Sequence, residues 1–208
     1  RRKNRDRRYK KAKYSMSLFM VYFGTKKTYS EMPHHNIIFG PRYKELIDDI
    51  FKHNILPDDF SIYLHVPTRT DPELAPHGCE TFYACVPVTH QDSGIDWEQM
   101  KEPFKKKVLQ YLNDNYLPEL LDNLVVSEVF TPLDFEREFN AYKGNAFQLQ
   151  PLLSQSGSFR PHNRSRDVKG LYIVGAGTHP GGGVPSAFLS GKISTDLIFE
   201  DHGKPNES

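Results

Sequence analysis

The chain has 208 residues, 38% of them hydrophobic, and a formal net charge of +1 at pH 7. This length suits one large domain or two small ones, and no apolar run approaches the roughly 18 residues of a membrane-spanning helix. Two cysteines, Cys79 and Cys85, are too few for a disulfide framework or a zinc–cysteine site, so we expect a reducing, cytoplasmic environment.

The first 13 residues form a basic segment, with nine of the 27 Lys and Arg residues and only one of the 26 acidic residues. Such a segment can attract anionic lipid or nucleic acid, or it can simply be solvated. Tyr9 is the only aromatic residue inside it, whereas sites for single-stranded nucleic acid combine basic and aromatic side chains. We therefore expect no nucleic-acid partner.

Patterns of alternation predict the strands of a sheet in the residues that follow. Residues 60–66 alternate apolar and polar side chains, which is typical of a strand with one buried face. Pro87 indicates that a strand over residues 82–88 lies at a sheet edge or that the proline stands near the strand's end. The other expected strands span residues 17–24, 36–39 and 125–130.

Helices are expected between these strands. Residues 40–53 carry an apolar stripe at helical spacing, and residues 96–116 form a longer helix in which Pro103 marks a break or a late start. Residues 117–124 continue that helix, residues 132–140 form a short one, and residues 147–159 are irregular. Because extended segments outnumber helices, we predict an antiparallel sheet, followed by a parallel-type strand and a helix at the end of the chain.

Few side chains before residue 171 form a pattern that carries chemistry. His34 and His35 could bind a metal ion, but neighbouring side chains of an extended chain point to opposite faces, so we predict a structural role and no metal site. His65 is a single histidine in a strand, where a packing role is expected. The basic residues Arg160, His162, Arg164 and Arg166 could contact a phosphate, clamp a flap or lie in a solvated loop.

Residues 171–200 read as a buried strand, a glycine-rich turn and a helix. Residues 171–174 are a short apolar run without alternation, as expected of a strand covered on both faces. Gly175 and Gly177 let the backbone turn sharply and let a ligand approach closely, and Pro185 suits the first helical turn. The free N–H groups and positive end of such a helix favour a phosphate, or an electron-rich ring that gains negative charge on reduction.

A complete dinucleotide fingerprint does not fit this stretch. Pro180 stands where its third glycine would be, and no second strand follows the helix. The stretch fits instead the last strand, turn and helix of a fold whose first half lies elsewhere. The helix carries small residues on one face, which would let it pack closely against a sheet. These residues are Ala187, Ser190, Gly191 and Ser194.

Residues 171–187 closely resemble the C-terminal flavin-binding signature of the bacterial and fungal type of phytoene desaturase. Further segments resemble the same family in the same order, and the likeness runs from about residue 14 to residue 201. That family is more than twice as long as this chain and begins with a dinucleotide-binding unit for the ADP half of FAD, which has no counterpart here. The further segments are residues 16–19, 22–24, 34–35, 39–43, 61–65, 70–72, 74–76, 130–132, 134–135 and 159–164.

The resemblance implies an α+β or α/β fold with two parts. A mixed-sheet substrate domain would be joined by the terminal strand, turn and helix of a Rossmann-like FAD-binding domain. After the basic segment at residues 1–13, we expect residues 14–160 to form mainly the substrate domain. Residues 161–201 would form the C-terminal part of the FAD-binding domain, and residues 202–208 a tail.

The resemblance also implies an FAD-dependent oxidoreductase of carotenoid biosynthesis. It would desaturate phytoene or a related C40 polyene, with a quinone or oxygen as electron acceptor, and no catalytic residue can be assigned. Because the substrate lives in lipid, we expect peripheral membrane contact, and we expect a missing N-terminal half to complete the flavin site. The residues that would face the flavin are Gly175, Ala176, Gly177, Thr178, Gly183, Val184, Pro185 and Ser186.

Two alternatives stay open at this point. One is another carotenoid oxidoreductase or isomerase of the same flavoprotein group, although the match in the glycine turn and at residues 159–164 favours a desaturase. The other is a non-catalytic, truncated fragment without flavin. Because no ADP-binding unit is present in the sequence, the isolated chain is predicted to bind FAD weakly or not at all.

Overall fold

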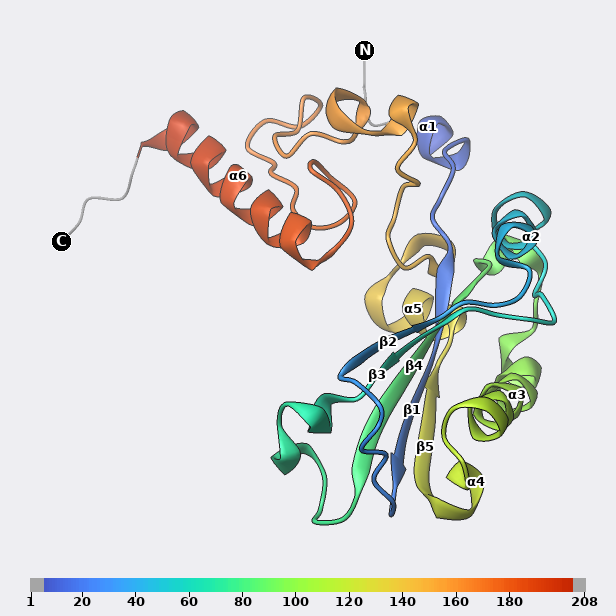
Figure 1. The fold of residues 1–208 in the computed structure, drawn as a ribbon. Helices are drawn as coiled ribbons and strands as arrows, with labels where there is room; N and C mark the ends of the chain where they lie inside the picture. Colours follow the sequence, from blue (N-terminus) through green and yellow to red (C-terminus); the bar gives the residue numbers. More distant parts are fainter. Residues whose placement is uncertain (1–5, 204–208) are drawn as a thin grey trace. The chain divides into compact units, whose positions relative to one another are not determined.

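The computed structural model describes residues 6–203. The chain divides into two compact units: Met16–Ala146, which we call the sheet unit, and Arg1–Ser15 with Phe147–Ser208, which we call the terminal unit. The first five residues of the basic segment and the last five of the expected tail lie outside the described residues. Figure 1 shows the course of the chain through each unit. The assignment of substrate binding and flavin binding to separate parts of the chain stays a prediction.

Five antiparallel strands of the described residues form the sheet, in the order β2-β3-β4-β1-β5. The strands expected before residue 131 are all present, and the α+β class is confirmed. The sheet is antiparallel rather than mixed, because every described strand pair runs in opposite directions. The strands are β1 Ser17–Thr25, β2 His35–Ile38, β3 Ile62–His65, β4 Glu80–Val88 and β5 Leu124–Phe130.

Pro87 marks the end of a central strand rather than an edge strand. β4 lies between β3 and β1, and its pairing with β3 reaches only as far as Cys85. Pro87 is the last residue but one of β4, so its missing N–H removes no bond to β3. Of the two interpretations of this proline, the strand end is the one that the structure confirms.

The helix α3 (Trp97–Asn115) packs on one face of the sheet and completes the core of this unit (Figure 1). Phe19 of β1 is fully buried there, with its ring centroid 5.6 Å from that of Trp97 and 4.9 Å from that of Phe104. Along β4 the burial alternates strictly, so every second side chain enters the same core. The period-2 pattern of the sequence therefore identifies the buried face correctly.

Pro103 does not interrupt α3. The helix begins directly after Asp96, whose side chain accepts a hydrogen bond from the N–H of Gln99 at 3.2 Å, and it continues to Asn115. Pro103 lies on the exposed side of the helix, where water can bond to the carbonyl that the missing N–H leaves free. The expected break was wrong because the buried side of the helix is anchored by the core.

The remaining helices are short, apart from the last one. α2 (Tyr43–Asp48) continues into a π-helical turn at Asp49–His53, which together cover the helix expected over residues 40–53. The others are α1 Asp6–Lys10, α4 Leu120–Asn123, α5 Pro132–Phe139 and α6 Val184–His202. Single 3₁₀ turns occupy Pro67–Arg69, Pro72–Leu74, Gln91–Ser93, Tyr142–Gly144, Leu153–Gln155 and Gly157–Phe159.

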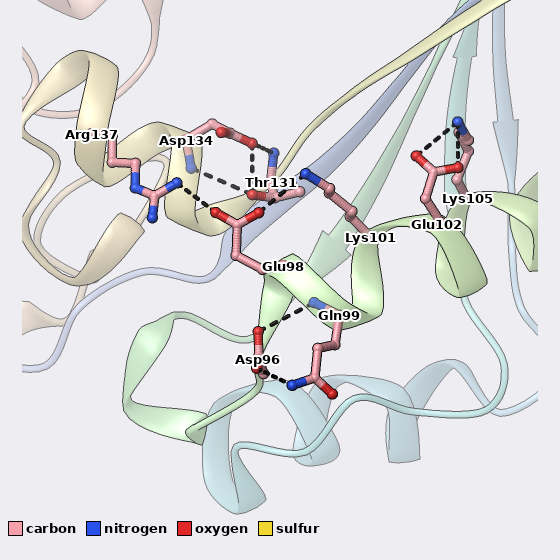
Figure 2. A network of polar contacts seen from close by, with 9 residues as sticks. All are labelled: Asp96, Glu98, Gln99, Lys101, Glu102, Lys105, Thr131, Asp134 and Arg137. Carbon is pink, nitrogen blue, oxygen red and sulfur yellow. Dashed lines mark hydrogen bonds and ion pairs between the residues drawn. The ribbon is translucent and has the colours of Figure 1, made fainter.

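A polar network joins the start of α3 to α5 (Figure 2). Glu98 accepts from Arg137 at 2.6 Å and from Lys101 at 3.1 Å, and the hydrogen bond from Arg137 is the main cause that lowers the pKa of Glu98. Thr131 and Asp134 form a capping box, in which the N–H of Thr131 donates to the Asp134 carboxylate at 2.7 Å. These contacts fix how α5 leaves the sheet.

Thr131→Ala is expected to lower the free energy of unfolding by about 1 kcal/mol, because it removes the side chain that accepts from the first turn of α5. Urea denaturation of the purified chain measures this change. Thr28→Ala is the matched control, since Thr28 is exposed and lies outside any helix or strand. Equal stability of the two variants would contradict the capping assignment.

The terminal unit consists of loops packed on α6. The expected strand at residues 171–174 was wrong: only Tyr172 forms a bridge, with Arg164, and Leu171 and Val174 are exposed. A strand needs a partner strand for its backbone groups, and none of the described residues offers one there. The irregular course of residues 147–159 is confirmed apart from its 3₁₀ turns, and α6 begins at Val184 as expected, with Pro185 in its first turn.

Candidate functional site

Arg160 is the buried centre of the glycine-rich turn. Only 3% of its surface is exposed, and its guanidinium donates to the carbonyl oxygens of Thr178 at 2.9 Å, Ala176 at 2.7 Å and Leu149 at 3.5 Å. No carboxylate among the described residues pairs with it, and burial lowers the pKa of Arg160. A contact with a phosphate and a clamp were both considered for Arg160. Its hydrogen bonds match a clamp, because they hold the backbone of the turn in place.

The other basic residues of the loop are placed differently. Arg164 forms ion pairs with Glu200 at 3.1 Å and Asp201 at 2.9 Å, so it fastens the loop to the end of α6. Arg164, Arg166 and His162 line a pocket of about 470 Å³ together with Arg160 and Arg8. This pocket has a strongly positive lining, and it lies within the terminal unit.

Asn163 is a structural residue of the turn that sequence reasoning missed. Its side-chain amide donates to the carbonyl oxygen of His179 at 3.0 Å, and its backbone carbonyl accepts from the N–H of Ile173 at 2.8 Å. The N–H of His179 in turn donates to the carbonyl of Pro161 at 3.0 Å. Residues 160–163 therefore join both arms of the turn. The only signal in the sequence was the family resemblance of residues 159–164, since an Asn in a polar loop looks unremarkable.

The predicted small-residue face of α6 is buried at its two serines, while Ala187 and Gly191 are half-buried and a Cβ at Gly191 would have no neighbour within 4 Å. Ser190 is fully buried, and its hydroxyl oxygen accepts from the N–H of Gly175 at 2.7 Å. Ser194 donates to the carbonyl of Ile173 at 3.2 Å. The partner is the irregular segment over residues 173–175 and not a sheet. Two serines of the helix thus satisfy backbone groups that a strand partner would otherwise satisfy.

The glycines of the turn fall into two kinds. Gly175 and Gly183 have φ values of 103° and 100°, which L side chains rarely adopt, so the chain itself requires them. Gly182 is also required by the chain, because a Cβ there would lie 2.9 Å from the carbonyl oxygen of Phe147. Gly177 is different: its backbone lies outside the left-handed region, and a Cβ would meet nothing closer than the Gln148 side chain at 3.9 Å. A Cβ at Gly177 would make only an ordinary van der Waals contact, so the packing of the turn does not itself require a glycine there.

The residues predicted to face a flavin lie on this turn and on the first turn of α6. Thr178 is fully buried, and its N–H donates to the carbonyl of Gly175, so it stabilises the turn. No side chain caps the N-terminus of α6, whose first N–H groups have no partner within the helix. A glycine at residue 177 that the packing of the turn does not require, and an uncapped helix start, fit a planar, electron-rich group such as a flavin ring.

His34, His35 and His65, three of the histidines considered in the sequence, lie together in the sheet unit. Ring centroids of His34 and His35 are 4.2 Å apart, so the expectation that they point apart was wrong. His34 lies just before β2 rather than inside it, and His65 of β3 pairs with His35 across the sheet. Burial, followed by the neighbouring His34 and His35, lowers the pKa of His65.

Comparison with known proteins assigns the chain to a family. The model of flavin containing amine oxidoreductases matches residues 57–198. The lycopene-forming phytoene desaturase of Pseudescherichia vulneris is 49% identical over 188 residues, which are 90% of this chain and 38% of that protein. The lycopene-forming enzyme of Pantoea ananas is 46% identical over the same shares of both chains. The neurosporene-forming phytoene desaturase of Rhodobacter capsulatus is 44% identical over 205 residues, 96% of this chain and 39% of the relative. The chain thus spans well under half the length of these relatives.

Proposed function

We propose a function on the premise that the chain belongs to the flavin-containing amine oxidoreductase family. The chain is, in this proposal, the C-terminal portion of an FAD-dependent carotenoid desaturase that acts on phytoene or a related C40 polyene. The names of the relatives support this choice, since they are phytoene desaturases that form lycopene or neurosporene. The observation that carries the proposal is Gly177, a glycine that the packing of the turn does not itself require, on a turn clamped by Arg160 and followed in the chain by the uncapped start of α6.

FAD, when bound, would supply the hydride acceptor for desaturation, in which a C–C bond of the polyene becomes C=C with loss of one hydride and, to solvent, one proton; a quinone or oxygen would be the final electron acceptor. The residues of this chain would bind and orient the ring. Backbone N–H groups of Ala176, Gly177, Gly183, Val184 and Ser186 would face it, with Gly177 allowing close approach. The N–H groups of Gly175 and Thr178 bond within the terminal unit, and Pro185 has none. The positive end of α6 would stabilise the negative charge that the ring gains on reduction. An N-terminal part of the whole protein would hold the ADP half.

Peripheral contact with a membrane is part of the proposal, because a C40 polyene dissolves in lipid and not in water. Among the described residues, no helix combines the length and the apolar character that crossing a bilayer requires. The sheet unit does expose several large apolar side chains near β2 and α2: Ile37, Phe39, Tyr43, Ile47, Phe51 and Ile55. Exposed aromatic and aliphatic side chains of this kind suit insertion at the surface of a bilayer.

The whole protein, purified with its flavin, tests the proposal. Incubated with phytoene in lipid vesicles and a quinone, it is expected to lengthen the conjugated polyene, seen as visible absorbance, and to consume quinone in proportion to the double bonds formed. Isomerised polyene without quinone consumption would make the protein an isomerase. Whole protein that carries no flavin would refute the proposal in any form.

The isolated chain is expected to bind FAD weakly or not at all, because its described residues offer the ring side of the site and no ADP-binding unit. Gel filtration after mixing with excess FAD, followed by an absorbance spectrum, measures the flavin that remains bound. The same experiment with a separately expressed N-terminal part is expected to restore flavin binding. Tight, stoichiometric FAD on the isolated chain would contradict this division of the site.

A further inference from the structure

We propose that His34, His35 and His65 form a binding site for a divalent transition-metal ion, with Zn²⁺ as the best-suited ion. The site lies in the sheet unit and is independent of the flavin proposal. The three imidazoles each offer one ring nitrogen, and these nitrogens all lie within 4.8 Å of one another. Imidazole is the ligand that zinc, copper and nickel accept most readily from proteins, whereas magnesium and calcium require oxygen ligands.

The backbone brings the three rings together. His35 and His65 are directly opposite each other in the antiparallel pair of β2 and β3. His34 is fixed next to them, because its carbonyl accepts from the N–H of Val66 at 2.9 Å. Cross-strand partners have neighbouring Cβ atoms on one face of the sheet, so the cluster follows from the strand register. β2 is an edge strand held by its ladder to β3, and β3 is held on both sides by β2 and β4, which gives the support that a preformed metal site needs.

The separation of the ligand nitrogens suits a small ion. Nε2 of His34 and Nε2 of His65 are 2.6 Å apart, a contact that requires a proton between them when no ion is present. In a tetrahedral zinc site with Zn–N bonds of 2.0–2.1 Å, the ligand nitrogens are about 3.3 Å apart. In the cluster, one pair of ring nitrogens is closer than this, at 2.6 Å, and no pair of ligand nitrogens is more than 4.8 Å apart. Small rotations of the rings would thus adjust the nitrogen spacing so that an ion can take the place of the shared proton.

Two of the rings have partners that orient them. Nδ1 of His35 lies 2.7 Å from the hydroxyl of Tyr63, and Nδ1 of His34 contacts the hydroxyl of Thr70. A hydrogen bond at Nδ1 leaves Nε2 as the nitrogen with a free lone pair, and such partners are the usual support of metal-binding histidines. His35 is exposed, while His34 and His65 are half-buried, so an ion can enter and a water can occupy a fourth position.

Metal titration of the tag-free chain tests this site. After treatment with EDTA and removal of the chelator, we expect calorimetry to show one Zn²⁺ bound per chain, and added Co²⁺ to give the intense visible bands of a tetrahedral site. His65→Gln and His35→Gln are each expected to weaken Zn²⁺ binding by about tenfold or more. His77→Gln is the matched control, because His77 is exposed and outside the cluster, and it should bind as the unchanged chain does.

Each result decides the proposal. The exposed His35 can be replaced without disturbing the core, so His35→Gln keeps the test valid if His65→Gln fails to fold, as circular dichroism would show. Mg²⁺ is expected to give no heat of binding, since its ligands are oxygens. Absence of Zn²⁺ binding by the unchanged chain would overturn the proposal. Binding that survives unchanged in His35→Gln would overturn it as well.

Discussion

Gly177→Val in the whole protein is expected to abolish flavin retention while leaving the stability of the fold unchanged. The fold tolerates the side chain, because a Cβ at this position is 3.9 Å from its nearest neighbour, the Gln148 side chain, and the backbone conformation is open to any residue. The proposed flavin does not tolerate it, since the ring needs the bare backbone at this point. The flavin-to-protein ratio after gel filtration and the urea midpoint of the purified chain measure the two effects separately.

Two other glycines serve as controls for this experiment. Gly182→Val is expected to lose flavin and stability together, because its Cβ would lie 2.9 Å from the carbonyl oxygen of Phe147 and 3.2 Å from the Phe147 Cβ. Gly191→Ala, inside α6 with nothing within 4 Å of its Cβ, is expected to keep the flavin and to gain up to about 1 kcal/mol of stability. Full flavin content in Gly177→Val would refute the placement of the ring at this turn.

The sequence predicts most of the sheet unit because its signals are local. Alternation over residues 60–66 and 82–88 identifies β3 and β4 and the face that each buries. The helix expected over residues 96–116 matches α3, apart from the break or late start expected at Pro103, and α6 begins where Pro185 predicts. Such elements depend on neighbours in the chain, so a single sequence is enough to find them.

The errors concern features that depend on residues distant in the chain. Residues 171–174 have the composition of a buried strand, yet no described strand pairs with them and they form only one bridge. The rule that adjacent side chains point apart fails at His34 because this residue stands outside β2, and His65 is brought to it by the pairing of β2 with β3. Local patterns contain no information on such partners.

Buried charges are the second kind of feature that the sequence conceals. Glu80 opens β4 and looks like an ordinary surface carboxylate, but only 2% of it is exposed. It accepts from the N–H of Tyr29 at 2.6 Å and forms an ion pair with Arg69. Burial of a charge is possible only where partners from other segments meet it, so composition alone cannot reveal it. Arg160 is a second buried charge that composition does not reveal, because in the sequence it looks like the neighbouring basic residues, which are at least partly exposed.

Arg160→Ala is expected to destabilise the terminal unit by about 3–5 kcal/mol, because it leaves two buried and one partly buried carbonyl oxygen without their charged donor. Hydrogen exchange over residues 173–186 reads this loss directly, since the only tryptophan, Trp97, lies in the sheet unit and does not report on the turn. Arg166→Ala is the matched control from the same loop, and its stability should change by no more than about 0.5 kcal/mol.

The same substitution connects the fold of the turn to the proposed flavin site. Arg160 contacts the carbonyls of Ala176 and Thr178, whose neighbour Gly177 is where the ring would approach. Arg160→Ala in the whole protein should therefore lose flavin through a loosened turn, whereas Gly177→Val loses it with the turn intact. Arg160→Lys separates charge from geometry, because one ammonium cannot reproduce the fork of donors that spans these carbonyls. If residues 173–186 exchange their amide hydrogens as slowly in Arg160→Ala as in Arg166→Ala, the turn does not depend on the hydrogen bonds of Arg160.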